Sequence, residues 1–313
     1  MANLSPVRQA AIIPPKIRMI RGTMGAVQEY AALLDASEEQ WVRLQGPRQP
    51  DIWGGPIAAR FRADPRREMD DNFLAVASYV TPDDVFIDAG GGAGRIGLPM
   101  ALRCKEVINV DPSPGMVEEF HACAQESSIT NVRGIVADWT DDHGAVGDVV
   151  YAANVTYFVR DIDVFVKKLE AAARRRVIIA IWSAPNPSHN ATLFKMVYGE
   201  EQATVPGYPE LLPALWEMGI LPDVQFFPHP WSFDGAPEEP GYPQDRESAM
   251  EGALAGIWLA AQDRDRAETV INQHFDELYQ ETDKGFVPTW LPNALPVLIT
   301  WDVRYHGIGA AKA

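Results

Sequence analysis

Short apolar runs alternate with amphipathic stretches through the middle of the chain. Apolar runs bounded by turn residues predict buried strands. Before the last run, Ile162, Phe165, Val166 and Leu169 recur at the spacing i, i+3, i+4, i+7 and predict an amphipathic helix. Alternation of strand and helix in this way predicts right-handed βαβ units and a parallel sheet. The predicted strands cover 85–87, 107–110, 132–137, 148–153 and 177–182.

The two flanks of this region follow other patterns. Residues 1–74 show no strand pattern and are expected to form a helical cap, whereas 75–183 are expected to form the ligand-binding core. Residues 184–313 include a stretch rich in proline and glycine, 205–243. Outside the core we expect helices over 26–34, 38–44, 57–62, 67–79, 247–261 and 267–282, and strands over 224–227 and 294–303.

The first predicted strand ends in a carboxylate, Asp88, which is followed by a glycine-rich turn and a predicted helix. A strand that passes through glycines into a helix brings bare backbone and a helix N-terminus to a ligand. The turn fits two frames. Gly92-x-Gly94-x-x-Gly97 matches the dinucleotide fingerprint. Asp88-x-Gly90-x-Gly92-x-Gly94 also explains the acid, which would repel a pyrophosphate and attract an ammonium group.

Polar residues recur where the predicted strands end, at Asp88, Asp111, Asp138 and Asn154. Ligands bind at the carboxyl ends of the strands in an open α/β sheet. Asp111 lies about twenty residues beyond the glycines, which is the spacing of an acid that binds ribose hydroxyls. The sequence therefore predicts one nucleotide-cofactor site at this edge of the sheet.

In the second glycine frame the chain resembles the class I S-adenosylmethionine-dependent methyltransferases, whose first motif is an acid followed by GxGxG. The phrase from Asp111 to Met116 is similar to the turn after the second strand in members that act on small molecules. The resemblance covers about residues 75–182. It implies an α/β, doubly wound, Rossmann-like sheet of seven mostly parallel strands with an antiparallel last strand. Residues 184–313 would complete that sheet, with a helical insertion on the acceptor side.

The resemblance also implies a role for each residue at a matching position. Asp88 and Gly90 would lie near the methionyl ammonium group of S-adenosylmethionine, and Asp138 would accept from the adenine amino group. Trp139 or Met116 would flank the adenine ring. The implied cofactor-binding set is Asp88, Ala89, Gly90, Gly92, Asp111, Pro112, Met116, Asp138, Trp139 and Asn154.

The residues after the fourth strand bear on the acceptor. Family members that methylate exocyclic amines on nucleobases or amides carry Asn/Asp-Pro-Pro-aromatic there, whereas this chain has the residues 154–157, Asn-Val-Thr-Tyr. A small molecule is therefore the expected acceptor, methylated by in-line displacement. A hydroxyl or ammonium acceptor needs a base, for which His189 and Tyr157 are the candidates. Trp53 and Phe61 are candidates for a cover over the site.

Two other functions stay open on these residues. An NAD(P)-dependent oxidoreductase would use Gly92-x-Gly94-x-x-Gly97 with Asp111 as its ribose acid, although Asp88 and the lack of a Tyr-x-x-x-Lys pair count against its commonest forms. A methyltransferase-like fold could also serve binding without catalysis. The intact acids and glycines of the loop count against that alternative.

Charge and composition limit the partners. The formal net charge of −16 disfavours nucleic acid and anionic membrane surfaces. The apolar run 10–13 is too short for a signal peptide, and no stretch reaches transmembrane length. Cys104 and Cys123 lack CxxC spacing and the six histidines are scattered, so we expect no disulfide framework and no metal site. We interpret the basic run 174–176 as a helix C-terminus. We expect a soluble, cytoplasmic protein, with a homodimer as one option.

Overall fold

The computed structural model describes residues 24–47, 51–229, 241–257 and 259–303. At its centre lies a seven-stranded sheet in the order β3-β2-β1-β4-β5-β9-β6, in which β9 is antiparallel to both of its neighbours. This is the predicted doubly wound sheet with an antiparallel last strand. The strands are β1 (Val85–Ala89), β2 (Glu106–Asp111), β3 (Val132–Val136), β4 (Gly147–Ala153), β5 (Ala173–Trp182), β6 (Asp223–Phe226) and β9 (Pro296–Asp302).

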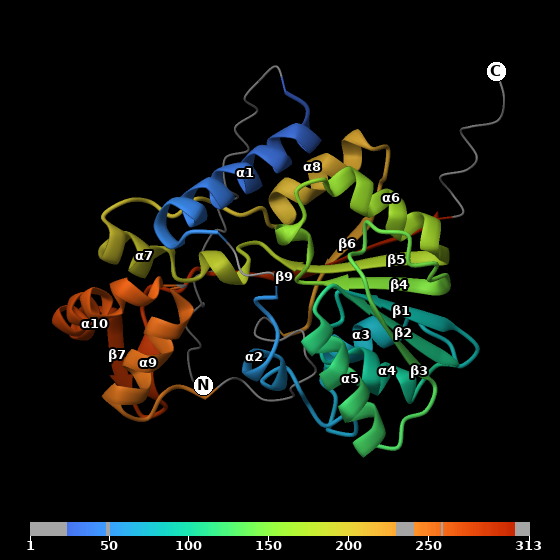
Figure 1. Cartoon of the computed structure of the whole chain (residues 1–313), viewed down its shortest axis with the longest axis horizontal. Coiled ribbons are helices and arrows are strands. Elements are labelled where there is room, and N and C mark those ends of the chain that lie inside the picture. Colours follow the sequence, from blue (N-terminus) through green and yellow to red (C-terminus); the bar gives the residue numbers. More distant parts are fainter. Residues whose placement is uncertain (1–23, 48–50, 230–240, 258, 304–313) are drawn as a thin grey trace, which may run out of the picture.

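Two layers of helices cover the two faces of the sheet (Figure 1). Successive side chains of a strand point to opposite faces, so Ile87 packs into one core and Phe86 into the other. Both are fully buried, which is why the parallel strands are apolar along their length. One layer contains α1 (Ala26–Gln45), α6 (Ile162–Ala172) and α8 (Tyr208–Glu217), and the other contains α3 (Asp71–Ala77), α4 (Gly97–Ala101) and α5 (Pro114–Glu126).

Polar caps fix where the helices of the second layer begin. The Ser113 hydroxyl accepts a hydrogen bond from the backbone N–H of Met116 at 3.1 Å, and proline occupies the first position of α5, as predicted. Asp70 caps α3 in the same way by accepting from Phe73 N at 2.8 Å. The predicted helix over 67–79 is therefore shorter at its start, because Asp70 ends the preceding turn.

Helix α1 is continuous, whereas the sequence suggested two helices separated at residues 35–37. Contacts with the rest of the protein stabilise the helical conformation through residues 35–37. The buried Tyr30 hydroxyl donates to Thr156 O at 2.7 Å, and Asp35 forms a bidentate pair with Arg160 at 2.7 and 2.9 Å. These bonds tie α1 to the segment that follows β4, so its second half extends over the carboxyl end of the sheet.

The segment between β6 and β9 is a helical insertion, as predicted, but it ends in a hairpin. The expected helix over 267–282 is wrong at its end, because residues from Tyr279 onward form two antiparallel strands. The insertion packs against α7 (Ala191–Tyr198) around a core of its own, seen at the lower left of Figure 1. Its elements are α9 (Arg246–Gly256), α10 (Arg264–Gln273), α11 (Phe275–Leu278), β7 (Tyr279–Thr282) and β8 (Gly285–Pro288).

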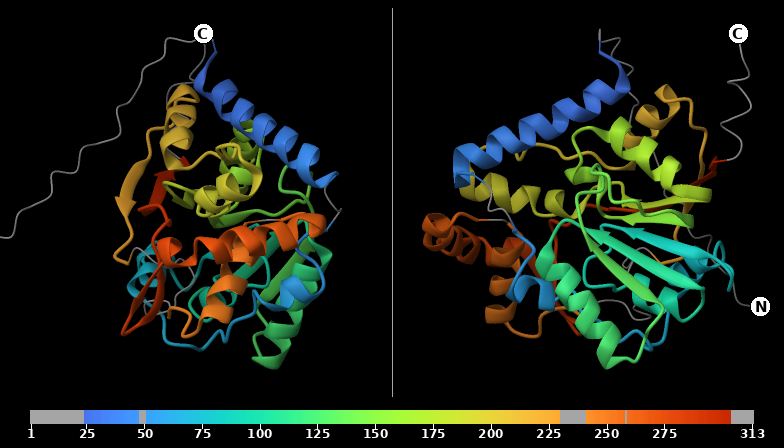
Figure 2. Two further views of the ribbon diagram at one scale, coloured as in Figure 1. Left: turned by 90° about the vertical axis from the view of Figure 1, so that its left-hand side faces the viewer. Right: turned by 45° about the vertical axis from the view of Figure 1, so that its right-hand side comes forward.

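Short elements complete the chain and lie close to the carboxyl ends of the strands. Figure 2 shows α1 and the insertion on the same side of the molecule, beside this edge of the sheet. The connections from β4 and β5 therefore run between them. The short elements are α2 (Pro56–Ala59), η1 (Thr156–Phe158), η2 (Asn186–Ser188) and η3 (Ala261–Asp263).

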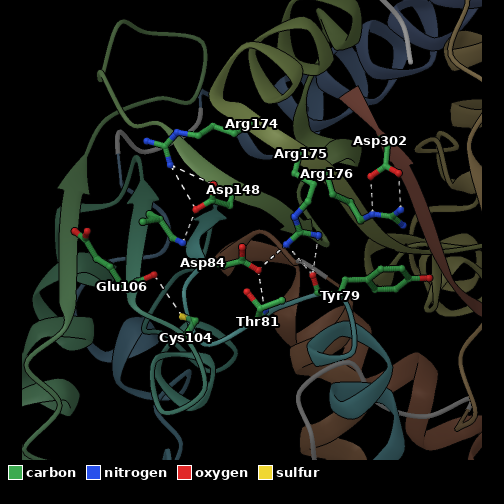
Figure 3. A network of polar contacts seen from close by, with 11 residues as sticks. Tyr79, Thr81, Asp84, Cys104, Glu106, Asp148, Arg174, Arg175, Arg176 and Asp302 are labelled. Carbon is green, nitrogen blue, oxygen red and sulfur yellow. Dashed lines mark hydrogen bonds and ion pairs between the residues drawn. The ribbon is translucent and has the colours of Figure 1, made fainter. Parts of the chain in front are cut away.

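The basic run 174–176 lies in β5 and not at a helix C-terminus, which corrects the interpretation from the sequence. Helix α6 passes into β5 without a loop, and each arginine meets an acid at the amino edge of the sheet (Figure 3). Arg175 donates to Asp84 at 2.5 Å and to the carbonyl of Tyr79 at 3.1 Å. Arg174 pairs with Asp148, and Arg176 pairs with Asp302 through two contacts of 3.0 Å.

We predict that the Asp84–Arg175 pair stabilises this edge measurably. Asp84 Oδ2 accepts both from Arg175 and from Thr81 N, and its side chain is only 11% exposed. Asp84→Ala should lower the free energy of unfolding by about 1.5–3 kcal/mol, because the hydrogen bonds to a shielded charge are lost. Urea unfolding measures this change. As a control, Glu251→Ala removes an exposed pair with Arg264 and should cost at most about 1 kcal/mol. Equal losses in both variants would contradict the prediction.

Candidate functional site

The glycine loop after β1 is tightly folded against its neighbours. Gly90 has φ +74°, and a Cβ atom there would lie 2.5 Å from Cγ2 of Val155. Gly94 has φ +85°, and a Cβ atom there would lie 2.5 Å from the ring of Phe120. A larger residue at either position would be strained in the backbone and would clash. The loop therefore presents backbone alone to the space above it.

Three polar side chains form a row beneath the loop, one from each of three neighbouring strands. Asp88 on β1 is in register with Asn109 on β2 and with Tyr151 on β4. All three are buried, and the Asn109 Oδ1 and Tyr151 hydroxyl oxygens have no hydrogen-bond partner among the residues that the structure describes. Burial, and then the charge of Asp111, raise the pKa of Asp88 to about 7. A cation above this row would relieve that unfavourable burial.

Asp111 at the end of β2 fastens the loop to the sheet. Its Oδ2 accepts from Gly92 N at 2.9 Å, and its Oδ1 accepts from Ser113 N at 2.9 Å. Burial outweighs these two bonds, so the pKa of Asp111 is raised. Each carboxylate oxygen has a second lone pair, so Asp111 can still accept from hydroxyl groups of a ligand.

The residues assigned to the adenine ring lie on both sides of one space. Met116 lies beside the loop, with its sulfur 3.5 Å from where a Cβ of Gly92 would be. Trp139 is buried, stacks near His143 with ring centroids 4.4 Å apart, and has an indole N–H without a partner among the described residues. Asp138 Oδ1 accepts from Thr140 N at 2.7 Å, which fixes the turn after β3.

Asn154 is held in a conformation that suits a ligand contact. It follows β4 with φ +56°, a left-handed conformation that asparagine tolerates. Its side-chain Oδ1 is buried and has no partner within the described part of the chain. Ala89, in contrast, packs into the core on the other side of β1 and does not face the site. The sequence pattern located the strand tip correctly but not the direction of this side chain.

A single cavity of about 1380 Å³ joins these elements. Sites for one small molecule usually measure about 300–1,000 Å³, so this cavity has room for a cofactor and a second molecule. Except for Ala89, it is lined by every residue that the sequence analysis assigned to the site: Asp88, Gly90, Gly92, Asp111, Pro112, Met116, Asp138, Trp139, Asn154, Tyr157 and His189.

The part of the cavity beyond the acids has a largely aromatic lining. The segment 51–61 packs beside the glycine loop, where Trp53 and Phe61 lie against Ala93 and Met116. Trp53 is edge-on to Phe61 and Phe158 at centroid distances of 5.9 and 5.7 Å. Gly54, next to Trp53, packs directly on Gly115 in the first turn of α5. A Cβ atom at Gly115 would lie only 2.8 Å from Gly54 Cα. Trp53 and Phe61, the candidates for a cover, therefore line the cavity beside the loop. Farther from the loop, the aromatic lining includes Trp41, Phe158, Trp182 and Phe194.

The two candidate bases have different environments. His189 is half-buried, and its Nε2 lies 2.8 Å from Ala184 O, so this nitrogen must carry the proton and Nδ1 is left as the acceptor. Burial lowers the pKa of His189 and keeps the ring neutral near pH 7. Burial also raises the pKa of Tyr157 far above neutrality. His189 is therefore the better base.

Sequence reasoning missed several residues in or beneath the site. Tyr151 lines the cavity and Asn109 supports the glycine loop, and both lie inside strands, where their polar groups look like interruptions of an apolar pattern. Gln202 and Trp41 reach the cavity from the loop after α7 and from α1, where no motif marks them. Among the described residues there is no group of three or more metal-ligating side chains. No helix in that part of the chain is long and apolar enough to span a membrane.

The sequence of the core is similar to known methyltransferases. Residues 87–181 match the family described as Methyltransferase domain. An uncharacterized protein of Haemophilus influenzae is 29% identical over 157 residues, which cover 49% of this chain and 57% of that protein. The ubiquinone biosynthesis O-methyltransferase of Mesorhizobium japonicum is 34% identical over 114 residues, which cover 36% of this chain and 41% of that enzyme. The chain thus spans about half the length of these curated relatives.

Solved structures establish the fold independently. The YcgJ protein of Bacillus subtilis superposes with a TM-score of 0.50 at 15% identity, covering 73% of this chain and 97% of that one. At this identity the likeness concerns the fold alone, and it agrees with the sheet order and the antiparallel β9. The family match begins at the end of β1 and includes the glycine loop and the polar strand tips. Residues 87–181 therefore match a methyltransferase domain, and the sheet around them is the Rossmann-like sheet of class I methyltransferases.

Proposed function

We propose that the protein transfers the methyl group of S-adenosylmethionine to a small-molecule acceptor. The observation that supports this most directly is the cavity, because it joins the glycine loop at one end to an aromatic chamber at the other. Its volume suits two ligands side by side. Residues 24–47 and the segment after β5 contribute Trp41, Phe194 and Gln202 to the chamber, in keeping with a cap and an acceptor side around the core.

The residues at the loop end fit the cofactor chemically. The Asp88 carboxylate would face the ammonium group, and Asp111 would accept from the ribose hydroxyls. The unpartnered Asn154 Oδ1 and Trp139 indole N–H offer one acceptor and one donor to the same ligand. No basic side chain lines this end beside the loop apart from Arg95, among the residues described, so a pyrophosphate would find little compensation for the acids.

The bound cofactor supplies an activated methyl group, so the chain's task is positioning. The aromatic walls and the cover at Trp53 exclude water and hold the acceptor in line. Orientation of this kind is worth about 7–11 kcal/mol of the barrier. The acceptor atom forms a bond to the methyl carbon while the carbon–sulfur bond breaks. If the acceptor is a hydroxyl, its proton passes to Nδ1 of His189, which Ala184 holds in the required tautomer.

A hydroxyl acceptor is favoured by one comparison. The Mesorhizobium japonicum relative is named an O-methyltransferase of ubiquinone biosynthesis. Its matched segment covers 36% of this chain. We therefore propose that the methylated atom is an oxygen. Which molecule carries it depends on the residues that line the chamber.

Ligand-induced stabilisation tests the cofactor assignment first. At a hundred times its dissociation constant, a ligand raises the free energy of unfolding by about 2.7 kcal/mol, which shifts the melting temperature by several degrees. We expect this shift with S-adenosylhomocysteine and none with NADH or NADPH, in scanning calorimetry of the pure protein. A shift with a nicotinamide cofactor alone would replace the proposal by an oxidoreductase. No shift with any ligand would favour a binding role without catalysis.

The buried Asp88 predicts that cofactor affinity depends on pH. The pKa of Asp88 is raised to about 7 in the free protein. The cofactor's ammonium group favours the ionised form, so binding releases a proton when the pH is below 7. The affinity for S-adenosylhomocysteine should therefore rise with pH by up to about tenfold per unit, and level off above 7. Titration calorimetry at several pH values measures this slope.

The matched variant for this experiment is Asp88→Asn, which keeps the shape and removes the titration. Its affinity should be lower at pH 8 and nearly constant from pH 6 to 8. If the variant kept the slope of the wild type, another group would be responsible and Asp88 would not contact the cofactor's ammonium group.

His189 predicts a second pH effect, on the rate. His189→Ala should lower kcat at least about a hundredfold and leave the affinity for S-adenosylhomocysteine unchanged. Because burial lowers the pKa of His189, the wild-type rate should fall only when the pH drops below the ordinary histidine range. Release of S-adenosylhomocysteine with phenolic acceptors measures the rate. His274→Ala, an exposed histidine outside the cavity, is the control. A larger loss in Tyr157→Phe than in His189→Ala would reverse the assignment.

A further inference from the structure

The loop between α7 and α8 brings a glutamine amide to the cavity in a fixed orientation. Gln202 Nε2 donates to the carbonyl of Pro187 at 2.8 Å. Since a carbonyl can only accept, the amide cannot be reversed, and Oε1 must point the other way. This Oε1 is buried and has no hydrogen-bond partner among the described residues. Gln202 lines the large cavity together with Pro187 and His189, and it also borders a smaller pocket between α1 and the loop after α7.

The backbone around Gln202 is held on both sides. Gln40 of α1 donates from Nε2 to Glu201 O at 2.9 Å and accepts at Oε1 from Ala203 N at 2.7 Å. Both polar atoms of Gln40 are therefore used within the protein, in contrast to Gln202. A buried carbonyl oxygen without a donor is unfavourable. The rigid surroundings prevent it from turning to solvent, so a ligand with a donor would be favoured at this position.

The charges around the cavity limit what that ligand can be. Carboxylates predominate among the described lining residues: Asp35, Glu38, Asp51, Asp88, Asp111, Asp138 and Asp161, against Arg95 and Arg160. Arg160 is engaged by Asp35 and Asp161. Arg95 donates to Arg60 O at 3.0 Å and lies over the ring of Phe61. An anionic acceptor would therefore meet repulsion without a dedicated cationic partner.

We propose that the acceptor carries no negative charge and has a flat apolar body, and that Gln202 accepts a hydrogen bond from a hydroxyl or amide N–H group other than the one that is methylated. Aromatic side chains surround the body and Gln202 sets its orientation relative to the methyl group. This proposal rests on the function proposed above, since it concerns the acceptor end of the same cavity.

Binding of simple probes tests the proposal without knowledge of the natural acceptor. Protein saturated with S-adenosylhomocysteine is dialysed against 1-naphthol, 2-naphthol, their methyl ethers and 2-naphthoate. We expect at least one naphthol to bind about tenfold more tightly than its methyl ether, and the naphthoate to bind more weakly than that naphthol. Equal binding of the naphthols and their ethers, tighter binding of the naphthoate, or no naphthol binding would overturn the proposal.

Two matched variants assign the preference to one side chain. Gln202→Met replaces the amide by an apolar chain of similar length and should weaken naphthol binding about tenfold while leaving the ethers unchanged. Gln225→Met is the control. Gln225 lies on β6 outside the cavity, where its amide donates a hydrogen bond to the Tyr79 hydroxyl. Unchanged discrimination in Gln202→Met would overturn the role of Gln202. If that variant does not fold, Gln202→Leu serves for the same comparison, because a preference of the wild type for naphthol could also come from Nδ1 of His189.

The same experiment separates this proposal from the one on which it rests. Failure of S-adenosylhomocysteine to bind the wild type would contradict the methyltransferase function. Binding of S-adenosylhomocysteine without discrimination among the probes would leave that function in place and overturn the inference about the acceptor alone.

Discussion

Both backbone groups of Gly92 are held by side chains of β2, and the geometry of the site depends on this contact. Gly92 N donates to Asp111 Oδ2 at 2.9 Å, and Gly92 O accepts from Asn109 Nδ2 at 2.8 Å. The loop after β1 is thereby fixed to the neighbouring strand through the peptide units on either side of one residue. Because β1 and β2 are in parallel register, the same contact places the row of Asn109, Asp88 and Tyr151 directly beneath the loop. This arrangement holds the carboxylates of Asp88 and Asp111 close together and away from solvent, which is unfavourable for their charged forms.

At the opposite edge of the sheet, formed by the amino ends of the parallel strands, the buried and half-buried acids are paired with arginines. At the amino ends of the strands each arginine of the run 174–176 in β5 meets an acid, as with Asp84 and Arg175. At the carboxyl ends Asp88 and Asp111 have backbone donors and each other, and burial raises the pKa of both. The acids at the amino edge are therefore neutralised by arginines. Those at the carboxyl edge have no cationic partner among the described residues, and the proposed cationic cofactor would bind there. This distribution follows the rule that ligands bind at the carboxyl edge of an open α/β sheet.

Much of this arrangement can be predicted from the sequence, since strand ends and helix caps are local signals. Asp88, Asp111 and Asn154 were predicted at strand tips and lie there. Errors arose where tertiary contacts decide. The run 174–176 was assigned to a helix because its acidic partners are far away in sequence, just before β1, in β4 and in β9. The hairpin from Tyr279 was hidden because its strands are four residues each. Asn109, Tyr151 and Gln202 were missed because only the assembled cavity shows that their oxygens lack donors.

The two ends of the cavity use different physical means to hold a ligand. At the loop end, selection rests on charge, because Asp88 becomes favourable as an anion only when a cation lies beside it. At the aromatic end the charges are already paired, Asp35 with Arg160, so shape and a single amide oxygen are left to discriminate. A cationic cofactor bound first would also reduce the repulsion among the acids and tighten the loop end before the acceptor enters. In the proposed function the order of binding would therefore follow from electrostatics, and the choice of acceptor from packing and one hydrogen bond.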